Sequence, residues 1–380
     1  MKNLEITVYK DFSDELSKLW LTFESESENY FFQSFNWQKL WYKQQIKYKN
    51  KINNHTVVVS IGNIIVMILP LNIQYNNNVK ILSWSGFPFS DYNAPLIRSN
   101  YTIDQKVFSI IWKKIISNND FDCVFFDNQP EKIINLLNPF FYFLKNNNNN
   151  YYYGIKFDKE FNIKKKELAN IKYQTNRLKN IGRLDFKTAS NTEDINKVLR
   201  FITVNKFKQY ERTNAWNLFN IDMHRDFFEL CNLTLKENID ISYLSLNNEI
   251  IAAQSGFKYR KRYYYLFPAY KNEFRKFSPG KILLQKLIIE HKLKLFDCFD
   301  LTIGSENYKA NFSNYKMKSA LFFHSKNLKG FIYILFCKLK YFIKIFIIFL
   351  PFKKYILNNF LRLKFSFYKI IYNRIKINVK

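Results

Sequence analysis

Residues 263–309 decide the fold of this chain, and they read YYYLFPAYKNEFRKFSPGKILLQKLIIEHKLKLFDCFDLTIGSENYK. The apolar run at residues 263–267 predicts a strand, because aromatic side chains suit the half-buried face of a sheet. Pro279-Gly280 predicts the start of a helix over residues 281–293, and the apolar run 299–303 predicts a second strand. A strand–helix–strand unit of this kind indicates a mixed sheet covered by helices.

The turn that begins this helix has the composition of an anion site. Pro279 costs nothing there because the first helical N–H has no acceptor within the helix. Ser278 is a typical N-cap residue, and Gly280 lets a ligand approach the backbone closely. The free N–H groups of a first helical turn attract anions, which makes the turn suitable for a pyrophosphate; an ordinary surface helix start is the alternative. Nearby side chains add positive charge: Arg275, Lys276 and Lys281.

The segment after the second strand carries groups that suit acyl transfer from a thioester to an amine. This reaction needs a base, a donor to the carbonyl oxyanion and an acid for the departing thiolate. Asp300 and Glu306 are the candidate bases, and Tyr308 is the candidate acid, since a phenol can protonate a thiolate. Lys309 would bind a phosphate, and the oxyanion donor would be a backbone N–H of residues 263–267.

Each of these residues also has a purely structural interpretation. Asp300 would orient the turn, Glu306 would pair with Lys309 three residues along a helix, and Tyr308 would pack in the core. Cys298 as an acyl-carrying nucleophile is disfavoured, because His291 is the sole histidine near it in sequence and is itself expected on the surface or in the core.

The order of these motifs resembles the acetyltransferase domain of the BioF2-like and CelD-like proteins in the GNAT superfamily. The resemblance rests on residues 278–281 before the helix and on residues 299–309 after it. The resemblance covers roughly residues 5 to 325. Further landmarks lie in the first half: Phe32-Gln33-Ser34, Trp37, Trp41, Leu69-Pro70-Leu71, residues 90–96, and Leu178 with Gly182. Gly182 is also the expected C-cap of a basic helix.

The resemblance implies an α+β fold of two tandem GNAT-like domains, related to the Fem peptidyl transferases, with mixed, largely antiparallel sheets flanked by helices. It implies transfer of an acyl group from acyl-CoA, often acetyl-CoA, to an amine. Residues 278–281 would hold the CoA pyrophosphate, with Arg275 beside them. Lys281 stands where Arg is common, which loses bidentate phosphate binding, and Ser305 stands where Asp is usual. Family members commonly sit in polysaccharide gene clusters, so the expected acceptor is a small or lipid-linked amino sugar.

A run of asparagines at residues 146–150 has no apolar face and favours a loop, so it marks a break in the chain. Similar successions of helices, an antiparallel meander and a strand–helix–strand unit lie before and after it. We therefore predict an N-terminal GNAT-like domain over residues 1–160 and an acyltransferase domain over residues 161–325. In the first domain, Asp91 and Tyr92 are expected to line the acceptor cleft, and Trp37 and Trp41 to lie in the core.

The chain has 59 Lys and Arg against 31 Asp and Glu, for a formal net charge of +28. Part of this excess reflects a bias towards Lys, Asn and Ile codons; the remainder would attract phosphates, nucleic acid or an anionic membrane. The four cysteines and four histidines stand apart from one another, so we expect no metal site and reduced thiols in a cytoplasmic protein. Residues 1–5 contain no apolar segment of a signal peptide.

The C-terminal segment is strongly basic. Residues 307–380 contain 16 Lys or Arg and no Asp or Glu, interleaved with Phe, Ile, Leu and Tyr, and Pro351 divides them into two expected helices. A basic amphipathic tail over residues 326–380 is typical of contact with the inner face of the cytoplasmic membrane. Packing of the tail on a domain, or binding to a partner, is the alternative.

Two other functions fit the same sequence. A Fem-like aminoacyl transferase using charged tRNA would exploit the basic charge, although the charge is concentrated in the tail and no coiled-coil arm is apparent. A non-enzymatic RNA- or membrane-binding protein would use a basic stripe around Lys172, Arg177, Lys179 and Arg183, which a solvated helix face explains as well. We expect nucleic acid not to be the partner.

Overall fold

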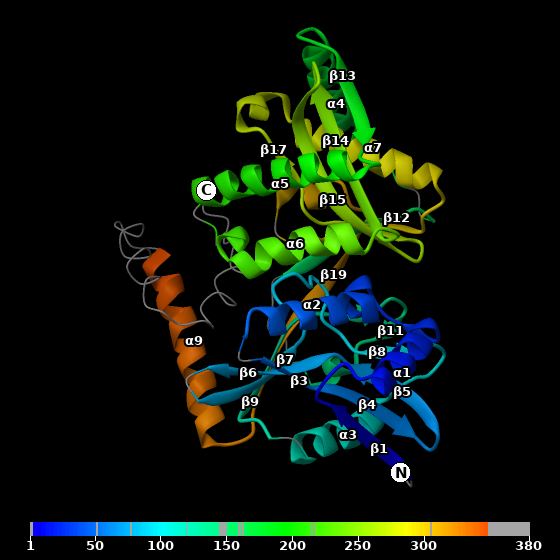
Figure 1. The fold of residues 1–380 in the computed structure, drawn as a ribbon, viewed down its shortest axis with the longest axis vertical. Helices are drawn as coiled ribbons and strands as arrows, with labels where there is room; N and C mark the ends of the chain where they lie inside the picture. The colour runs from blue at the N-terminus through cyan, green and yellow to red at the C-terminus, as the bar shows by residue number, and fades with distance from the viewer. Residues whose placement is uncertain are drawn as a thin grey trace. The chain divides into compact units, whose positions relative to one another are not determined.

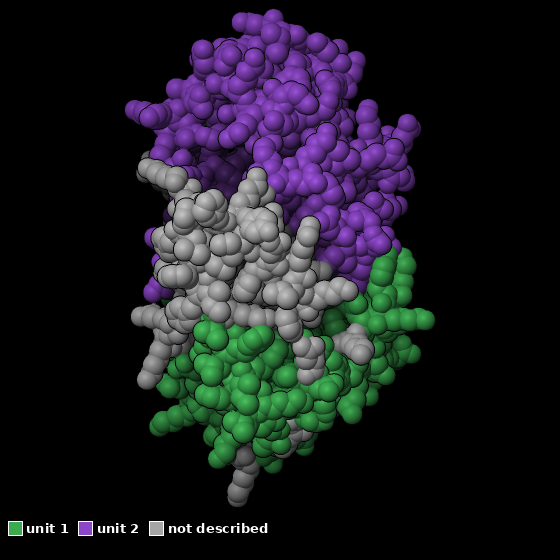
Figure 2. Space-filling model, turned by 90° about the vertical axis from the view of Figure 1, so that its left-hand side faces the viewer, with its two compact units in different colours: residues 1–148, 320–380 green, residues 149–319 purple. Residues whose placement is uncertain are grey.

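A computed structural model of the protein describes residues 3–50, 52–76, 78–118, 120–143, 150–158, 161, 163–213, 215, 217–304 and 306–348. The chain forms two compact units, coloured separately in Figure 2. One unit comprises residues 149–319, and the other comprises residues 1–148 with residues 320–380. The domain boundaries at 160 and 325 stay predictions; β12 (Tyr151–Lys156) pairs with β18 (Cys298–Ile303) within the unit of residues 149–319.

The unit of residues 149–319 is built on one mixed sheet with the strand order β13-β14-β15-β16-β18-β12-β19. Its neighbouring strands pair antiparallel except β16 and β18, which pair in parallel. The Asn247-Asn248 turn joins β14 to β15, with both residues at positive φ, which asparagine tolerates better than most residues. The remaining strands are β13 (Leu184–Thr188), β14 (Ile239–Leu246), β15 (Glu249–Tyr259), β16 (Arg262–Tyr265), β17 (Ala269–Tyr270) and β19 (Tyr315–Ser325).

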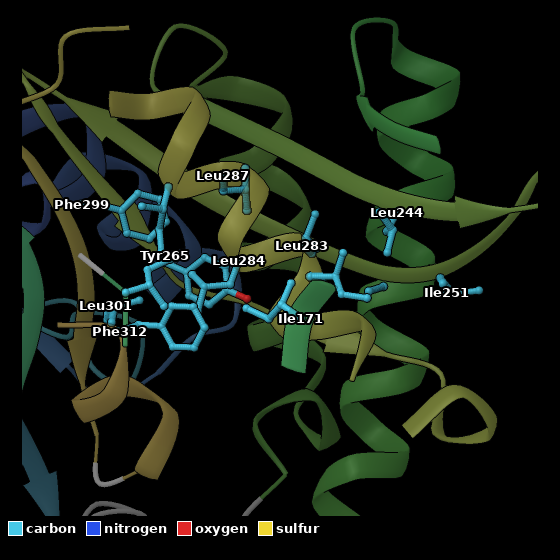
Figure 3. Close-up of a cluster of buried hydrophobic side chains, with 14 of the residues drawn as sticks. Ile171, Leu244, Ile251, Tyr265, Leu283, Leu284, Leu287, Phe299, Leu301 and Phe312 are labelled. Carbon is cyan, nitrogen blue, oxygen red and sulfur yellow. The ribbon is translucent and has the colours of Figure 1, made fainter. Parts of the chain in front are cut away.

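Helices pack on this sheet, and Figure 1 shows α5 lying across strands β14 and β15. Ile171, Leu283 and Leu287 are buried in the main hydrophobic cluster of the unit, together with Phe299 and Phe312 (Figure 3). Burial of each such side chain stabilises the fold by about 1.5–3 kcal/mol. The helices are α4 (Lys165–Lys179), α5 (Thr192–Thr213), α6 (Asp222–Thr234), α7 (Pro279–Leu293) and α8 (Asn307–Asn311), with 3-10 turns η3 (Leu218–Asn220) and η4 (Asn272–Phe277).

Strands β16 and β18 separate in the middle of the sheet. Their pairing runs from Arg262 opposite Cys298 to Tyr264 opposite Asp300 and ends there. The chain after β16 turns back towards β15, where the Phe267 N–H donates to the Ser255 carbonyl at 3.1 Å. Because β18 continues to Ile303 without this neighbour, the residues that follow it lie at an open edge between two parallel strands.

The described strands of the other unit follow the orders β1-β4-β5-β8-β2 and β9-β7-β6-β3, and β10 and β11 form a separate two-stranded sheet. Strands β4 and β5 form a hairpin around Gly62. Its elements are β1 (Leu4–Tyr9), β2 (Ser27–Glu28), β3 (Ile52–Asn54), β4 (Thr56–Ile61), β5 (Ile64–Leu69), β6 (Leu71–Asn76), β7 (Val79–Trp84), β8 (Leu96–Arg98), β9 (Cys123–Pro130), β10 (Lys132–Ile133), β11 (Leu136–Leu137), α1 (Asp14–Ser25), α2 (Phe35–Lys47), α3 (Gln105–Asn118), α9 (Leu328–Ile348), η1 (Phe31–Gln33) and η2 (Pro139–Tyr142).

The C-terminal segment begins as a helix that packs on this unit. Ile334 and Cys337 of α9 are buried against Ile81 and Phe125, which lie on β7 and β9. Gly330 permits this contact, since a Cβ there would lie 2.0 Å from the Asp122 carbonyl oxygen. Within the described part of the chain, no helix has the length and apolarity needed to cross a membrane. The predicted second tail helix lies outside the described residues.

Helix α4 ends close to the predicted position, but Gly182 does not cap it. Helix α4 ends at Lys179 with Asn180 as its C-cap, and Gly182 does not adopt the left-handed conformation of a glycine cap. Gly182 instead allows a close approach: a Cβ there would lie 2.4 Å from the side-chain amide of Asn247. That side chain accepts a hydrogen bond from the Arg183 N–H at 2.8 Å, which fixes the β14–β15 turn against the start of β13.

Candidate active site

The Ser278–Gly280 turn lies between η4 and α7, at the start of the helix as predicted. Ser278 is the N-cap, but its backbone is left-handed (φ 51°, ψ 47°) and its side chain makes no capping hydrogen bond, which corrects the expected role of that hydroxyl. Its carbonyl accepts from the Lys281 N–H at 2.9 Å, whereas the Gly280 N–H donates to no group in the described chain. The space beside Gly280 is open, since a Cβ on this residue would have only the Tyr270 ring near it, at 3.6 Å. The turn therefore presents a donor to a ligand.

Lys281 is held away from the role expected for it. Its Nζ pairs with Glu167 of α4 at 2.9 Å, while the other oxygen of that carboxylate accepts from Asn311 of α8 at 3.3 Å. Lys281 is thus partly neutralised and reaches a phosphate only by leaving Glu167. The same carboxylate ties the first turn of α7 to α8, so it brings the two halves of the predicted site together.

Arg275 and Lys276 supply exposed positive charge beside the turn, as expected. The sequence interpretation missed a third cation, Arg177, which it placed in a basic stripe on a surface helix. The Arg177 guanidinium lies over the Phe277 ring at 4.8 Å, directly before Ser278. Nothing in the spacing of residues 172–183 predicts this contact, because it depends on how α4 packs against η4.

Asp300 does not have the geometry of a general base. Its side chain is completely buried, with one oxygen 2.7 Å from the Arg262 guanidinium and the other accepting the Thr302 N–H at 2.8 Å. Arg262 also donates to the Tyr315 hydroxyl at 3.2 Å. Both carboxylate oxygens are therefore occupied, and Asp300 fixes the end of β18 rather than meeting a substrate.

Glu306 and Lys309 lie together after the Gly304 turn. Their charged groups are 3.5 Å apart, and the Lys309 Nζ donates to the Ile303 carbonyl at 2.6 Å. Lys309 is buried, whereas the Glu306 side chain is 35% exposed. Ser305, between Gly304 and Glu306, lies outside the described residues.

Tyr308 packs against the hydrophobic cluster that contains Phe312 and Leu301. Burial raises the pKa of Tyr308 well above its usual value, and the negative charge of Glu306 raises it further. The phenol is therefore neutral at physiological pH, which is the form that a proton donor must have. In Figure 3, Tyr265 lies among Phe299, Leu284 and Leu301 of the same cluster.

The remaining predicted residues are buried or half-buried. Burial of Cys298 raises the pKa of its thiol to about 11. The negative charge of Asp300 adds to this increase, and the lowering effect of the Arg262 charge does not offset it. The high pKa disfavours a nucleophilic thiolate. His291 is in the core, 3.4 Å from the Asp240 carboxylate. Tyr92 belongs to the other unit, where it is fully buried and stacked on Tyr30, so its side chain packs rather than lines a cleft; Asp91 beside it is half-buried.

Replacement of Gly304 by alanine is expected to lower acyl transfer about 10²-fold at little cost in stability. A Cβ at Gly304 would lie 2.1 Å from a Glu306 carboxylate oxygen and 2.6 Å from the Lys309 Nζ, so both groups must move. A displacement of about 1 Å at a reacting group costs on the order of 10² in rate. Since the displaced atoms end flexible side chains, the free energy of unfolding should fall by only about 1 kcal/mol.

Gly62→Ala is the matched control for this substitution. Like Gly304, Gly62 has a positive φ (61°), but nothing lies within 4 Å of the position that a Cβ would occupy on Gly62. It should lose a similar free energy of unfolding and keep full activity. Equal activity of the two variants in a thiol-release assay would contradict the placement of Glu306 and Lys309 in the site.

The chain is similar to known proteins in part of its sequence and in its fold. Residues 165–310 match the family described as the acetyltransferase (GNAT) domain. FemX is 11% identical and superposes with a TM-score of 0.55 over 87% of this chain and 99% of that one. A conserved protein of Bacteroides thetaiotaomicron VPI-5482 is 10% identical, with a TM-score of 0.51 over 83% and 99%. A tandem GNAT protein from the clavulanic acid biosynthesis pathway is 9% identical, with a TM-score of 0.47 over 86% and 99%. No curated protein sequence matches the chain.

The match to the acetyltransferase (GNAT) domain indicates an acyltransferase. The match covers residues 165–310, and the fold of the chain is similar to that of FemX. The mixed sheets flanked by helices confirm the predicted α+β fold class. Within the described residues, no group of three or more His, Cys, Asp or Glu side chains is placed to hold a metal ion.

Proposed function

We propose that the protein is an acyl-CoA-dependent N-acyltransferase that acetylates an amine of a sugar or glycan precursor in cell-surface polysaccharide biosynthesis. The observation that supports this most is the link through Glu167 between the open turn at Gly280 and helix α8, which carries Tyr308 and Lys309. The turn suits the CoA pyrophosphate, and Arg275, Lys276 and Arg177 surround it with positive charge.

The reaction uses the groups at the open edge of β18. The amine nitrogen attacks the thioester carbon, a C–N bond forms, and the C–S bond breaks as the tetrahedral adduct collapses. Glu306 accepts the proton that the amine loses, and the neutral Tyr308 donates a proton to the departing CoA thiolate. Asp300 and Arg262 hold β18 so that these side chains remain in place. The Phe267 N–H is already bonded to Ser255, so the oxyanion donor lies elsewhere on residues 263–266 or on the facing backbone.

The donor can be established by one assay. Purified protein is incubated with acetyl-CoA and a set of amino sugars, free and nucleotide-linked, and thiol release is recorded. We expect release that depends on the amine and that falls in Gly304→Ala. If the protein transfers an aminoacyl group from aminoacyl-tRNA and no acyl group from acyl-CoA, it is an aminoacyl transferase instead. The fold also permits that function.

We also propose that α9 docks on an anionic membrane surface. Its outward side carries an apolar stripe in which every side chain is 42–73% exposed, while its other side packs on β7 and β9. No acidic residue follows Glu306, so the charge around the stripe suits anionic headgroups. The stripe consists of Leu328, Phe331, Ile332, Leu335, Phe336 and Leu339.

Substitution of Phe331 and Leu335 by aspartate should lower binding to phosphatidylglycerol vesicles at least about tenfold, since each buried apolar side chain contributes about 1.5–3 kcal/mol. Both residues are more than half exposed, so the fold should be retained. Leu293→Asp, at a 78% exposed leucine of α7, is the control and should bind like the wild type. Sedimentation with vesicles measures the bound fraction; unchanged binding of the double variant would show that another molecule or segment covers the stripe.

A further inference from the structure

A concave groove runs along one face of α5. It has a volume of about 740 Å³, and its other wall is formed by the β14–β15 turn and by residues 270–273. The α5 residues that line it extend from Glu193 to Arg212, which corresponds to about 28 Å along the helix axis. A hollow of this volume is in the range that holds small molecules rather than a folded macromolecule.

The groove is basic at two places. Lys197 and Arg200 line one end, and Lys208 lies about 12–16 Å further along the axis, near Arg212. Arg212 donates to Asn272, and the Lys271 ammonium in the opposite wall pairs with Glu249. By contrast, Lys197, Arg200 and Lys208 form no ion pair with the described part of the chain, so their charge is available to a ligand.

Between the two basic places the lining is apolar and rich in amides. Phe201 and Val204 face the groove, and Val204 is 46% exposed. Asn205, Gln209 and Asn248 provide neutral donors and acceptors around them. Such a surface suits an elongated molecule that combines phosphate groups with a ring or sugar, and it is poorly suited to a simple inorganic anion.

One residue connects the groove with the candidate cofactor turn. Tyr270 lines the groove, and its ring lies 3.6 Å from the position that a Cβ would occupy on Gly280. A ligand that fills the groove as far as Tyr270 would therefore contact a residue that also borders the turn.

We propose that this groove binds the acyl acceptor and that the acceptor is a phosphate-bearing amino sugar of nucleoside-diphosphate size. The inference rests on the proposed function, because it names the acceptor class for that reaction. Arg200 binds the diphosphate, the apolar centre at Phe201 and Val204 packs against the adjoining ring, and Lys208 binds the oxygen atoms at the far end of the ligand. The same chemistry has a second source, the nucleotide end of the acyl-CoA itself, which the experiment must separate.

The test compares Arg200→Glu/Lys208→Glu with Lys206→Glu. Lys206 is on the same helix but does not line the groove; at 100° per residue it faces away from Val204 and Lys208. The probes are UDP-glucosamine, for the acceptor, and acetyl-CoA and adenosine 3′,5′-bisphosphate, for the donor, each titrated by calorimetry. We expect the double variant to lose at least about tenfold in affinity for UDP-glucosamine and none for acetyl-CoA, while Lys206→Glu changes neither.

Three results would overturn the proposal. The first is that wild-type protein fails to bind UDP-glucosamine at millimolar concentration. The second is that the double variant binds it as the wild type does. The third is that the double variant loses affinity for acetyl-CoA and adenosine 3′,5′-bisphosphate, which would assign the groove to the donor. Because acetyl-CoA is titrated separately, failure of the acceptor site is distinguishable from failure of the proposed function.

Discussion

Replacement of Arg262 by methionine is expected to lower the free energy of unfolding by about 3–5 kcal/mol. The Arg262 side chain is 16% exposed and lies 2.7 Å from the fully buried Asp300 carboxylate. Removal of one partner of a buried ion pair leaves the other charge in a medium that solvates it poorly. Urea unfolding followed by circular dichroism measures the change.

The double variant Arg262→Met/Asp300→Leu separates the buried charge from the loss of packing. Replacement of a whole buried pair by apolar residues is often neutral, so we expect the second substitution to restore most of the lost stability. If the double variant is as unstable as the single one, the destabilisation comes from packing at β16 rather than from the unpaired carboxylate. Activity should stay low in the double variant, because Asp300→Leu also removes the acceptor of the Thr302 N–H, which orients the end of β18.

Replacement of Glu306 by glutamine is expected to lower kcat about 10²–10⁴-fold, the range that general-base catalysis contributes. Of the two predicted bases, only Glu306 has a partly exposed side chain, whereas both oxygens of Asp300 are engaged. The Lys309 side chain is only 7% exposed, so loss of its charged partner should also lower the stability, by about 1–3 kcal/mol. Thiol release at saturating acetyl-CoA and acceptor gives kcat.

A structural role for Glu306 predicts different behaviour from a catalytic one. If Glu306 is the base, an acceptor amine of low pKa, already deprotonated at the assay pH, should recover part of the lost rate in the variant. Glu290→Gln removes a comparable carboxylate, paired with Lys294 on α7, and should leave kcat unchanged. An equal loss of rate for acceptors of low and high pKa would assign Glu306 to positioning.

The elements of the acyltransferase domain could be predicted because their signals are local. Pro279-Gly280 predicts the start of α7, and the Asn247-Asn248 turn predicts the β14–β15 hairpin; both are present in the structure. The residues after β18 could be selected as candidates for the same reason, since they follow a short apolar run and a glycine. The pairing of Glu306 with Lys309 also follows from a spacing of three residues on a helix.

The partners of these residues could not be predicted, because they lie far away in sequence. Asp300 meets Arg262 only through the parallel register of β16 and β18, and Lys281 meets Glu167 across 114 residues. Arg177 looked like part of a solvated stripe until the packing of α4 placed it on Phe277. These contacts convert Asp300 from a candidate base into a positioning residue and Lys281 from a free phosphate ligand into one already paired.

Binding of acyl-CoA at the turn preceding α7 is tested most directly by thermal stability with and without acetyl-CoA, in the wild type and in Gly280→Trp. A ligand that binds only the folded state raises its stability, by about 2.7 kcal/mol at 100 times the Kd. The tryptophan has room beside Tyr270, so this variant should fold and yet fill the cradle. A rise in melting temperature for the wild type and none for Gly280→Trp is the predicted result. No rise for the wild type with acetyl-CoA or longer acyl-CoAs, or an equal rise in both proteins, would contradict it.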